Sequence, residues 1–214
     1  MKLAERLCLF SEDRNALLLS AGFAPLIYKQ LLNGSESGAY KSQIAEVLAA
    51  QMPNPCLALD RRWNLIEANQ IVHCILEDLD VDAQLLIPPV NLIRLILHPK
   101  GLAPSLEDLP LWHQLLMNRL RNRQARINDP ILSKLYNELD RYTKFRTKRV
   151  ISQPSRIALP FRLRLNAGTT SFLSTMMVFE ASSIEGALPE IVVETFLSID
   201  DQTTAILKKL VERT

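Results

Sequence analysis

The stretch IALPFRLRLNAGTTSFLSTMMVFE, residues 157 to 180, decides the fold class. Its first nine residues alternate, so that one face carries apolar side chains and the other carries arginines. This two-residue period is typical of a β-strand with one buried face. NAGT then makes a turn, and SFLSTMMVFE runs back as a second strand. The apolar face of the first strand holds Ile157, Leu159, Phe161, Leu163 and Leu165, opposite Arg162 and Arg164.

Three further strands are expected around this hairpin. CLALD (56–60) and NLIEAN (64–69) flank a polar turn, and EIVVETFLSI (190–199) gives a last strand. Helices are expected at 70–79, at 91–98, around WHQLLMNRL (112–120), from Asp129-Pro130 onward, and after residue 200. Two strands, several helices and three strands predict an α/β (α+β) fold. Its five-stranded antiparallel sheet has helices packed on one side.

Composition excludes several classes of protein. The 214 residues are 48% hydrophobic and 22% charged, which is typical of a soluble globular chain with one domain and a small extra segment. A net charge of +2 does not by itself indicate a nucleic-acid partner. The three cysteines are far apart, so neither a disulfide framework nor a thiolate metal site is indicated. No apolar run is long enough for a membrane span. We expect a cytoplasmic protein with no cofactor, no metal and no membrane partner.

The chain divides into three parts. In the first part, residues 1–28, residues 2 to about 24 read as two short helices, within KLAERLCLF and SEDRNALLLSAGFAP. Residues 29–42 form a linker marked by NGSESG. The main domain is expected at 43–214 and begins with the helix QIAEVLAAQM, which Pro53 closes.

Several blocks in this order resemble a known family. PCLALDRRWNLIEAN, PPVNLIRLILHPKGLAP, LPLWHQLLMNRL, NDPILSKLYNEL, LPFRLRL and VETFLSIDDQT are similar to the MmyB-like ligand-binding domain of bacterial XRE-family transcription regulators. The strand and helix order is that of a PAS-like sensor domain. Residues 1–28 resemble the last part of the family's helix-turn-helix. We therefore expect residues 1–28 to be a helical remnant of a DNA-binding domain.

The resemblance implies a function as well as a fold. It implies a non-enzymatic sensor that binds a small apolar or fatty-acid-like ligand and forms a homodimer. Specific DNA binding is expected only if a complete helix-turn-helix is present in the native full-length protein. The alternative is a PAS-like dimerisation or interaction module without a ligand. A hydrolase built on the neighbouring His73 and Cys74 is disfavoured, because adjacent helical residues point about 100° apart.

Five residues are candidates for ligand contact. Arg94 is the candidate anchor for a carboxylate, because a guanidinium stays charged and can grip both oxygens. The alternative for Arg94 is that it extends to the surface or holds a loop carbonyl. Asn91 is expected to cap the helix that follows it, and His98 to hydrogen-bond backbone where that helix ends. Asn69 is expected to close the hairpin, and Met176 to fill the core; a ligand contact is the alternative for each of these four.

Overall fold

A computed structural model describes residues 37–126, 129–142, 159–179, 182–183, 186–187 and 191–213. The segment predicted as a helix-turn-helix remnant, residues 1–28, lies outside these residues. The elements, in chain order, are α3 (Ser37–Ala49), β1 (Cys56–Leu59), β2 (Leu65–Ala68), α4 (Gln70–Asp78), the 3-10 helix η1 (Ala83–Leu86), α5 (Leu92–Leu97), α6 (Leu109–Arg126), α7 (Pro130–Asp140), β3 (Pro160–Leu165), β4 (Gly168–Phe179), β5 (Ser182–Ser183), β6 (Gly186–Ala187), β7 (Ile191–Ser198) and α8 (Asp201–Glu212).

The main sheet has five strands in the order β2-β1-β7-β4-β3, and every neighbouring pair is antiparallel. This confirms the predicted mixed α/β fold with a five-stranded antiparallel sheet. The hairpin that decided the fold class is β3 and β4, whose register pairs Phe161 with Phe172. The short β5–β6 pair forms a separate two-stranded sheet that the sequence did not predict.

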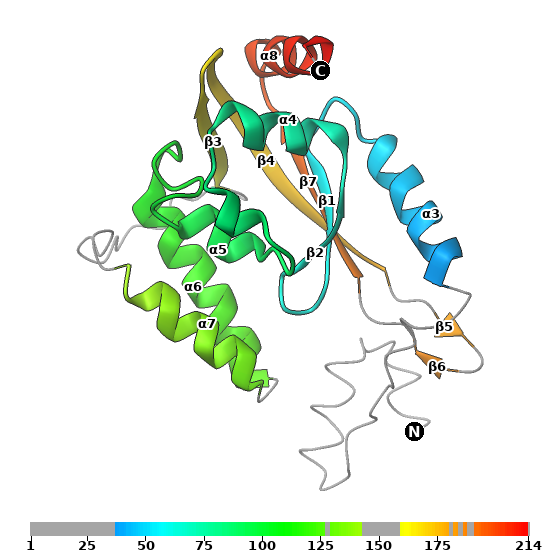
Figure 1. Ribbon diagram of the computed structural model, residues 1–214, viewed down its shortest axis with the longest axis vertical. Coiled ribbons are helices and arrows are strands. Elements are labelled where there is room, and N and C mark those ends of the chain that lie inside the picture. The colour runs from blue at the N-terminus through cyan, green and yellow to red at the C-terminus, as the bar shows by residue number, and fades with distance from the viewer. Residues whose placement is uncertain are drawn as a thin grey trace, which may run out of the picture.

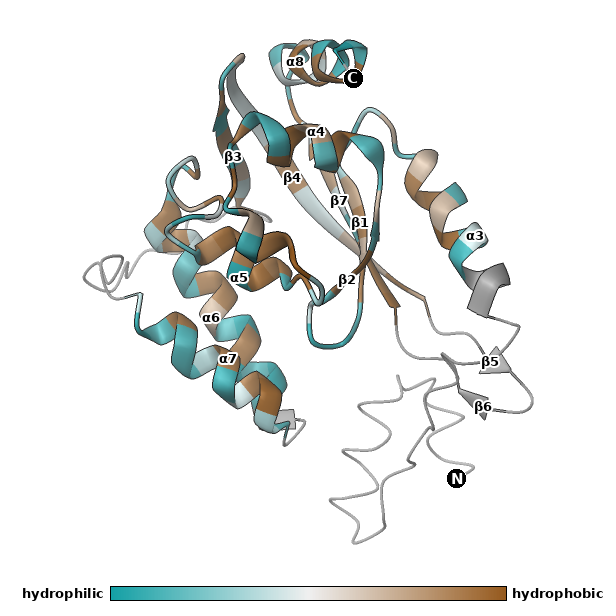
Figure 2. Ribbon diagram, in the orientation of Figure 1, coloured by the Kyte–Doolittle hydropathy of each residue, from teal (hydrophilic) through white to brown (hydrophobic). Residues whose placement is uncertain are grey.

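The two faces of the sheet are covered differently. On the inner face, Leu57, Phe161, Phe172 and Phe196 belong to the main hydrophobic core. Helices α4 to α8 all contribute side chains to this core, and α5 and α6 lie on the same side of the sheet in Figure 1. Figure 2 shows that α6 and α7 alternate between hydrophobic and hydrophilic residues, as amphipathic helices do. The inner face is therefore the one that faces the helical layer.

The outer face has a second, smaller core. Leu48 of α3 packs there against Cys56, Ala58 and Val193, all buried. Figure 1 shows α3 on the other side of the strands from α5, α6 and α7. Helix α3 thus packs on the outer face, whereas helices α4 to α8 contribute to the core on the inner face. Helix α3 begins at Ser37, which lies inside the stretch expected as linker. The helix runs without a break from Ser37 to Ala49, and it includes Gly38.

Local sequence signals set the ends of the helices around the inner face. The carboxylate of Asp129 accepts a hydrogen bond from the backbone N–H of Ile131, and Pro130 occupies the first turn of α7. The carboxylate of Asp200 likewise accepts from the N–H of Thr203 at the start of α8. The predicted apolar stripe of α7 is buried at Leu132, Leu135 and Leu139.

An aromatic cluster fills one half of the inner face. Trp112 of α6 meets Phe161 edge to face, with ring centroids 5.0 Å apart, and Phe161 packs on Phe196 at the same separation. The Trp112 indole N–H donates to the carbonyl of Pro160 at 3.1 Å. Helix α6 therefore packs closely against this half of the sheet.

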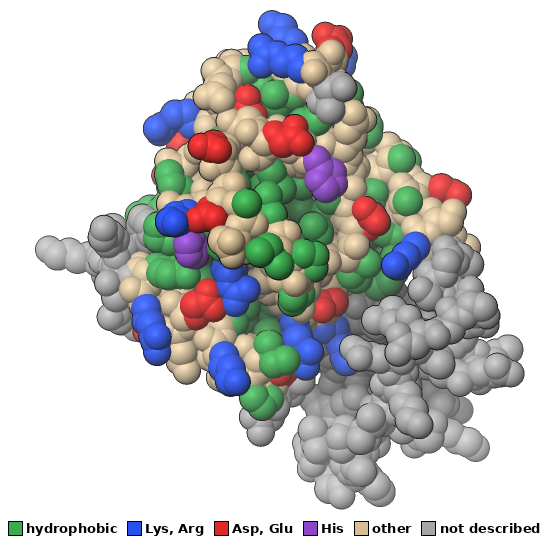
Figure 3. All heavy atoms as spheres, viewed as in Figure 1, with side chains coloured by type: hydrophobic (Ala, Val, Ile, Leu, Met, Phe, Trp, Pro, Cys, Tyr) green, Lys and Arg blue, Asp and Glu red, His purple; other side chains and the backbone are tan. Residues whose placement is uncertain are grey.

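Figure 3 shows hydrophobic side chains gathered at the centre of the face seen in Figure 1, with charged side chains around them.

Candidate ligand-binding site

Arg94 lies on α5, where its guanidinium is already bound. Its Nε and Nη2 donate to the two carboxylate oxygens of Glu138 on α7, at 2.7 and 2.8 Å. The Glu138 hydrogen bond raises the pKa of Arg94, and the Arg94 hydrogen bond lowers the pKa of Glu138. The pair joins α5 to α7. A ligand carboxylate could use the two-pronged grip of Arg94 only by displacing Glu138.

His98 lies at the end of α5, next to the same pair. Its Nδ1 accepts a hydrogen bond from the backbone N–H of Lys100 at 3.0 Å, so His98 does contact backbone where the helix ends. Its ring meets Tyr142 edge to face, with centroids 5.2 Å apart. The Tyr142 hydroxyl donates to Glu138 at 3.3 Å, and burial raises the pKa of Tyr142. The structure therefore brings Arg94 and His98 together around Glu138.

Asn91 is the N-cap of α5, as predicted. Its Oδ1 accepts from the backbone N–H of Arg94 at 3.2 Å. Its Nδ2 donates to the carbonyl of Arg62 and to Oδ1 of Asn64, at 2.7 and 3.1 Å. The side chain is buried, and both ends of its amide are bonded within the protein. Asn91 therefore fixes the start of α5 against the β1–β2 turn.

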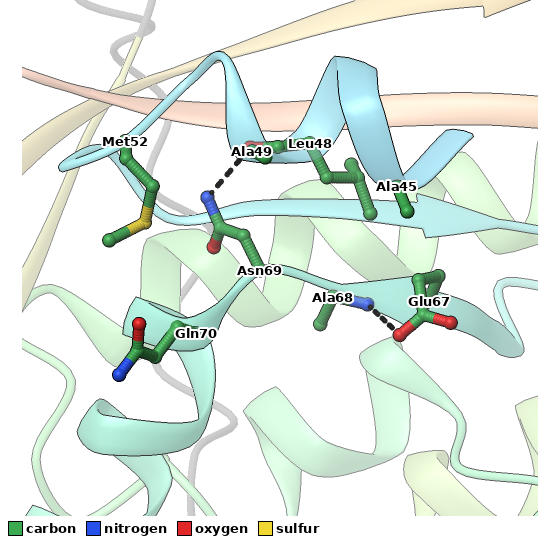
Figure 4. A pocket seen from close by; sticks show the side chains of 8 residues that line it. All are labelled: Ala45, Leu48, Ala49, Met52, Glu67, Ala68, Asn69 and Gln70. Atoms are coloured by element: carbon green, nitrogen blue, oxygen red, sulfur yellow. Dashed lines mark hydrogen bonds between the residues drawn. The ribbon is translucent and has the colours of Figure 1, made fainter. Parts of the chain in front are cut away.

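Asn69 precedes α4, but its side chain makes no capping hydrogen bond to that helix. Its Oδ1 accepts from the N–H of Cys56, and its Nδ2 donates to the carbonyls of Leu48 and Asn54. The buried amide thus ties α3 and the loop after it to the sheet. Asn69 also lines a groove of about 190 Å³ between α3 and β2, shown in Figure 4. The groove is lined by Ala45, Leu48, Ala49, Met52, Glu67, Ala68, Asn69 and Gln70.

Glu194 is a buried carboxyl that the sequence reasoning did not single out. It lies in the middle of β7 and is 4% exposed. Its strand partners are Leu57 on one side and Met176 on the other, and this register puts its side chain on the inner face. The hydroxyl of Ser174 donates to its Oε1 at 2.6 Å. Nη1 of Arg119, on α6, lies 4.0 Å from the same oxygen. We call Glu194, Ser174 and Arg119 the inner-face cluster.

The electrostatics of the inner-face cluster differ from those of Arg94 and Glu138. Burial raises the pKa of Glu194, and the Ser174 hydrogen bond and the Arg119 charge only partly oppose this effect. Met176 was expected to fill the core, with a ligand contact as the alternative. It stands directly across the strand pair from Glu194 and is 48% exposed, so it does not fill the core. The cluster thus combines a cation with a carboxyl whose pKa is raised, and Met176 adds apolar surface beside it. These groups could together hold the head of an amphipathic molecule.

The model of the MmyB-like transcription regulator ligand binding domain matches residues 41–210. The chain belongs to this family. The match spans all five strands of the main sheet and includes the inner-face cluster and the pair of Arg94 and Glu138. No curated protein matches the chain at a significant level.

The MmyB-like domain family is a family of transcription regulator domains and not a family of enzymes. On α4, Cys74 is buried whereas His73 is exposed, so the two side chains point to different faces of the helix. Within the described part of the chain, no three His, Cys, Asp or Glu residues lie close enough to hold a metal ion. Nor do the helices described here include one that is long and apolar enough to cross a membrane.

Sequence reasoning missed Arg119, Glu138 and Glu194, although one of them carried a signal. Glu194 interrupts the apolar run IVVETFLS, and the strand period puts it on the same face as Val192 and Phe196. A lone carboxyl among core positions is rare enough to indicate a special role. Arg119 and Glu138 lie on amphipathic helices, where charged residues are common, so only the packing of the helices could identify them.

Proposed function

We propose that this MmyB-like domain is the sensing part of a bacterial XRE-family transcription regulator and binds a small apolar or fatty-acid-like effector. The family match over residues 41–210 carries the proposal, because it assigns a ligand-binding role to the whole sheet and its helices. An acyl chain suits such a role: each buried methylene contributes about 0.8 kcal/mol, so a chain of about ten supplies roughly 8 kcal/mol before entropy costs. The domain acts by binding and not by catalysis, in a reducing cytoplasm.

The five residues predicted for ligand contact are not equivalent in this proposal. Met176 is the best placed, because it is half exposed on the inner face. Arg94 and His98 would take part only if Glu138 released Arg94. Asn91 and Asn69 would act indirectly, since their amides hold α5 and α3 in position.

DNA reading is assigned to a complete helix-turn-helix in the native full-length protein. The described domain should therefore show only weak, salt-sensitive and sequence-independent DNA binding, of the kind set by phosphate contacts. Footprinting at moderate salt tests this expectation. A protected, sequence-specific site on a promoter that survives about 200 mM salt would contradict it.

The direct test of effector binding is native mass spectrometry of the purified 214-residue chain, followed by organic extraction. We expect a population that carries extra mass, and an extract that contains amphipathic molecules of that mass. Denatured protein from the same preparation is the control for covalent adducts. A chain that shows no extra mass, and that takes up no fatty acid when one is supplied, would contradict the proposal.

A second candidate function is self-association through the sheet, with or without a ligand. Two residues of β4, Met177 and Phe179, support this candidate function. Both side chains point away from the inner face, and they are 42% and 44% exposed. Exposed apolar side chains on a strand suit a contact with a second copy of the chain. Light scattering after gel filtration should give a dimer whose stability falls in Met177→Lys. A monomer at every concentration tested would remove this candidate.

A further inference from the structure

We propose that Arg119 and Glu194, and not Arg94, bind the acidic head of the effector, a carboxylate on an apolar chain, on the inner face beside the central strand β7. This inference rests on the proposed function, since it names the head group and the residues that take it. It makes Arg119 and Glu194 specificity-determining residues of the domain.

The guanidinium groups of the two arginines are bonded differently. Nε and Nη2 of Arg94 already donate to both oxygens of Glu138. Nη1 of Arg119 lies 4.0 Å from Glu194, whereas a charge-assisted hydrogen bond between such groups spans about 2.7–2.9 Å. The Arg119 side chain is 32% exposed, so it stands at the boundary between solvent and a buried carboxyl. An incoming carboxylate can therefore reach the Arg119 guanidinium without breaking a two-pronged ion pair.

The carboxyl of Glu194 can take part in binding through its proton. The side chains that face it are Leu57 from β1, Ser174 and Met176 from β4, and Arg119 from α6. Arg119 is the charged group among these described neighbours. Because burial raises the pKa of Glu194, its carboxyl keeps its proton to a higher pH than an exposed glutamate does. A protonated Glu194 can donate a hydrogen bond to a ligand carboxylate, whereas an ionised Glu194 would repel it. Binding of the acid should therefore strengthen as the pH falls.

The apolar part of the effector can lie on exposed apolar side chains of β4. Met176 lies opposite Glu194 in the strand register, and Val178, two residues along β4, lies on the same face. These side chains are 48% and 43% exposed. An acyl chain that leaves the Arg119 guanidinium can cover them and remove their apolar surface from water. The other half of the inner face is filled by the aromatic cluster around Phe161 and Phe196, so this end is the side on which a chain can lie.

The experiment is calorimetric titration of the 214-residue chain with dodecanoate, and with dodecan-1-ol as the head-group control. Arg119→Met keeps the apolar stem and removes the guanidinium, and it should weaken dodecanoate binding by about tenfold or more. Arg121→Met, on the exposed side of the same helix, is the matched control and should leave the affinity unchanged. Binding of dodecan-1-ol should be weaker and should not respond to Arg119→Met.

The pH arm uses Glu194→Gln, which keeps a hydrogen-bond donor but cannot ionise. Affinity of the parent for dodecanoate should fall as the pH rises, whereas the affinity of Glu194→Gln should stay level. Thermal melts confirm that each variant is folded, and Arg119→Lys, with an intermediate loss, replaces Arg119→Met if that variant does not fold.

The outcomes separate two kinds of failure. If the parent binds dodecanoate and Arg119→Met binds it equally well, the head-group assignment is overturned while the proposed function stands. Equal affinity for dodecanoate and dodecan-1-ol would overturn the acidic class of the head. If the parent binds neither molecule, the fatty-acid-like effector itself is rejected, and the assignment of Arg119 and Glu194 is rejected with it.

Discussion

Two arginine–glutamate pairs in this domain have the same chemistry but different surroundings. Arg94 and Glu138 bridge two helices, both oxygens are bonded, and each side chain is about one third exposed. Arg119 and Glu194 connect α6 to the middle of the sheet, and Nη1 of Arg119 lies 4.0 Å from Oε1 of Glu194. Of these two side chains, Glu194 is buried and Arg119 is partly exposed. The first pair is complete as it stands. The second leaves a buried carboxyl beside a loosely held cation.

The difference shows why an ion pair should be judged by its geometry and burial before its residue types. A satisfied pair at a helix–helix contact contributes modestly to stability and has little left to offer a ligand. Burial destabilises the charged form of a carboxyl that has no close ionic partner. Carboxyls with a pKa shifted in this way cluster at functional sites. We therefore infer a structural role for Arg94 and propose a binding role for Arg119.

The largest effect on stability is expected when Glu194 loses its hydroxyl donor. Ser174→Ala removes the hydrogen bond at 2.6 Å to a buried oxygen, and it should lower the free energy of unfolding by about 1 to 3 kcal/mol. Thr175→Ala is the matched control, because that neighbour points to the other face and its hydroxyl makes only a 3.4 Å contact. Urea unfolding measures both. An equal, small loss in the two variants would show that Ser174 does not support the carboxyl.

The second prediction concerns pH, where the two glutamates should act in opposite directions. The pKa of Glu194 is raised above the ordinary value of 4.5, so the folded state holds a proton that the unfolded state releases. Its contribution to stability is complete below pH 4.5 and is lost as the pH rises toward the folded pKa. The pKa of Glu138 is lowered, so its contribution is present above pH 4.5 and is lost as the pH falls.

Single substitutions separate the effects of the two glutamates on the pH dependence of stability. Glu194→Gln should remove a decline of at most about 1.4 kcal/mol per pH unit on the alkaline side of 4.5, and should leave the acid side unchanged. Glu138→Gln should reduce the loss of stability on the acid side only. Urea unfolding of both variants from pH 3.5 to 8 gives the comparison. Parallel curves for the parent and Glu194→Gln would contradict the raised pKa.

The smallest effect is expected at Arg94. Arg94→Met should cost about 1 kcal/mol or less, because the pair is partly exposed and screened by solvent. A double-mutant cycle with Glu138→Gln should show a coupling energy of about 0.5 kcal/mol, and at neutral pH the cycle of Arg119 and Glu194 should show less. Lys100→Met, which breaks the more exposed pair with Asp82, is the control and should cost less still. A coupling near zero for Arg94 and Glu138 would remove their structural role.

Much of the fold followed from local patterns. Strand alternation at Phe161, Leu163 and Leu165 placed β3 correctly, and the cap residues Asn91 and Asp129 marked the starts of α5 and α7. These signals depend on neighbours a few residues away, so a single sequence contains them. The start of α3 was missed because Gly38 and the surrounding serines suggested a break, although the helix runs on through Ala49.

The site was harder to predict, because its residues meet only in three dimensions. Arg94 was singled out as a cation on an apolar helix, but its partner Glu138 lies 44 residues further along the chain. Glu194 and Ser174 are brought together by the register of β7 on β4, and Arg119 by the docking of α6. Of the predicted contacts, Met176 alone belongs to the same part of the inner face as Glu194, because the strand period fixed the face to which it points.

A crystal structure of the chain with bound dodecanoate tests the central claim most directly. The account predicts the ligand carboxylate within hydrogen-bond distance, about 2.7–3.0 Å, of the Arg119 guanidinium, with the acyl chain across Met176 and the pair of Arg94 and Glu138 intact. A carboxylate bound by Arg94 with Glu138 displaced, or an acyl chain in the groove between α3 and β2, would contradict it.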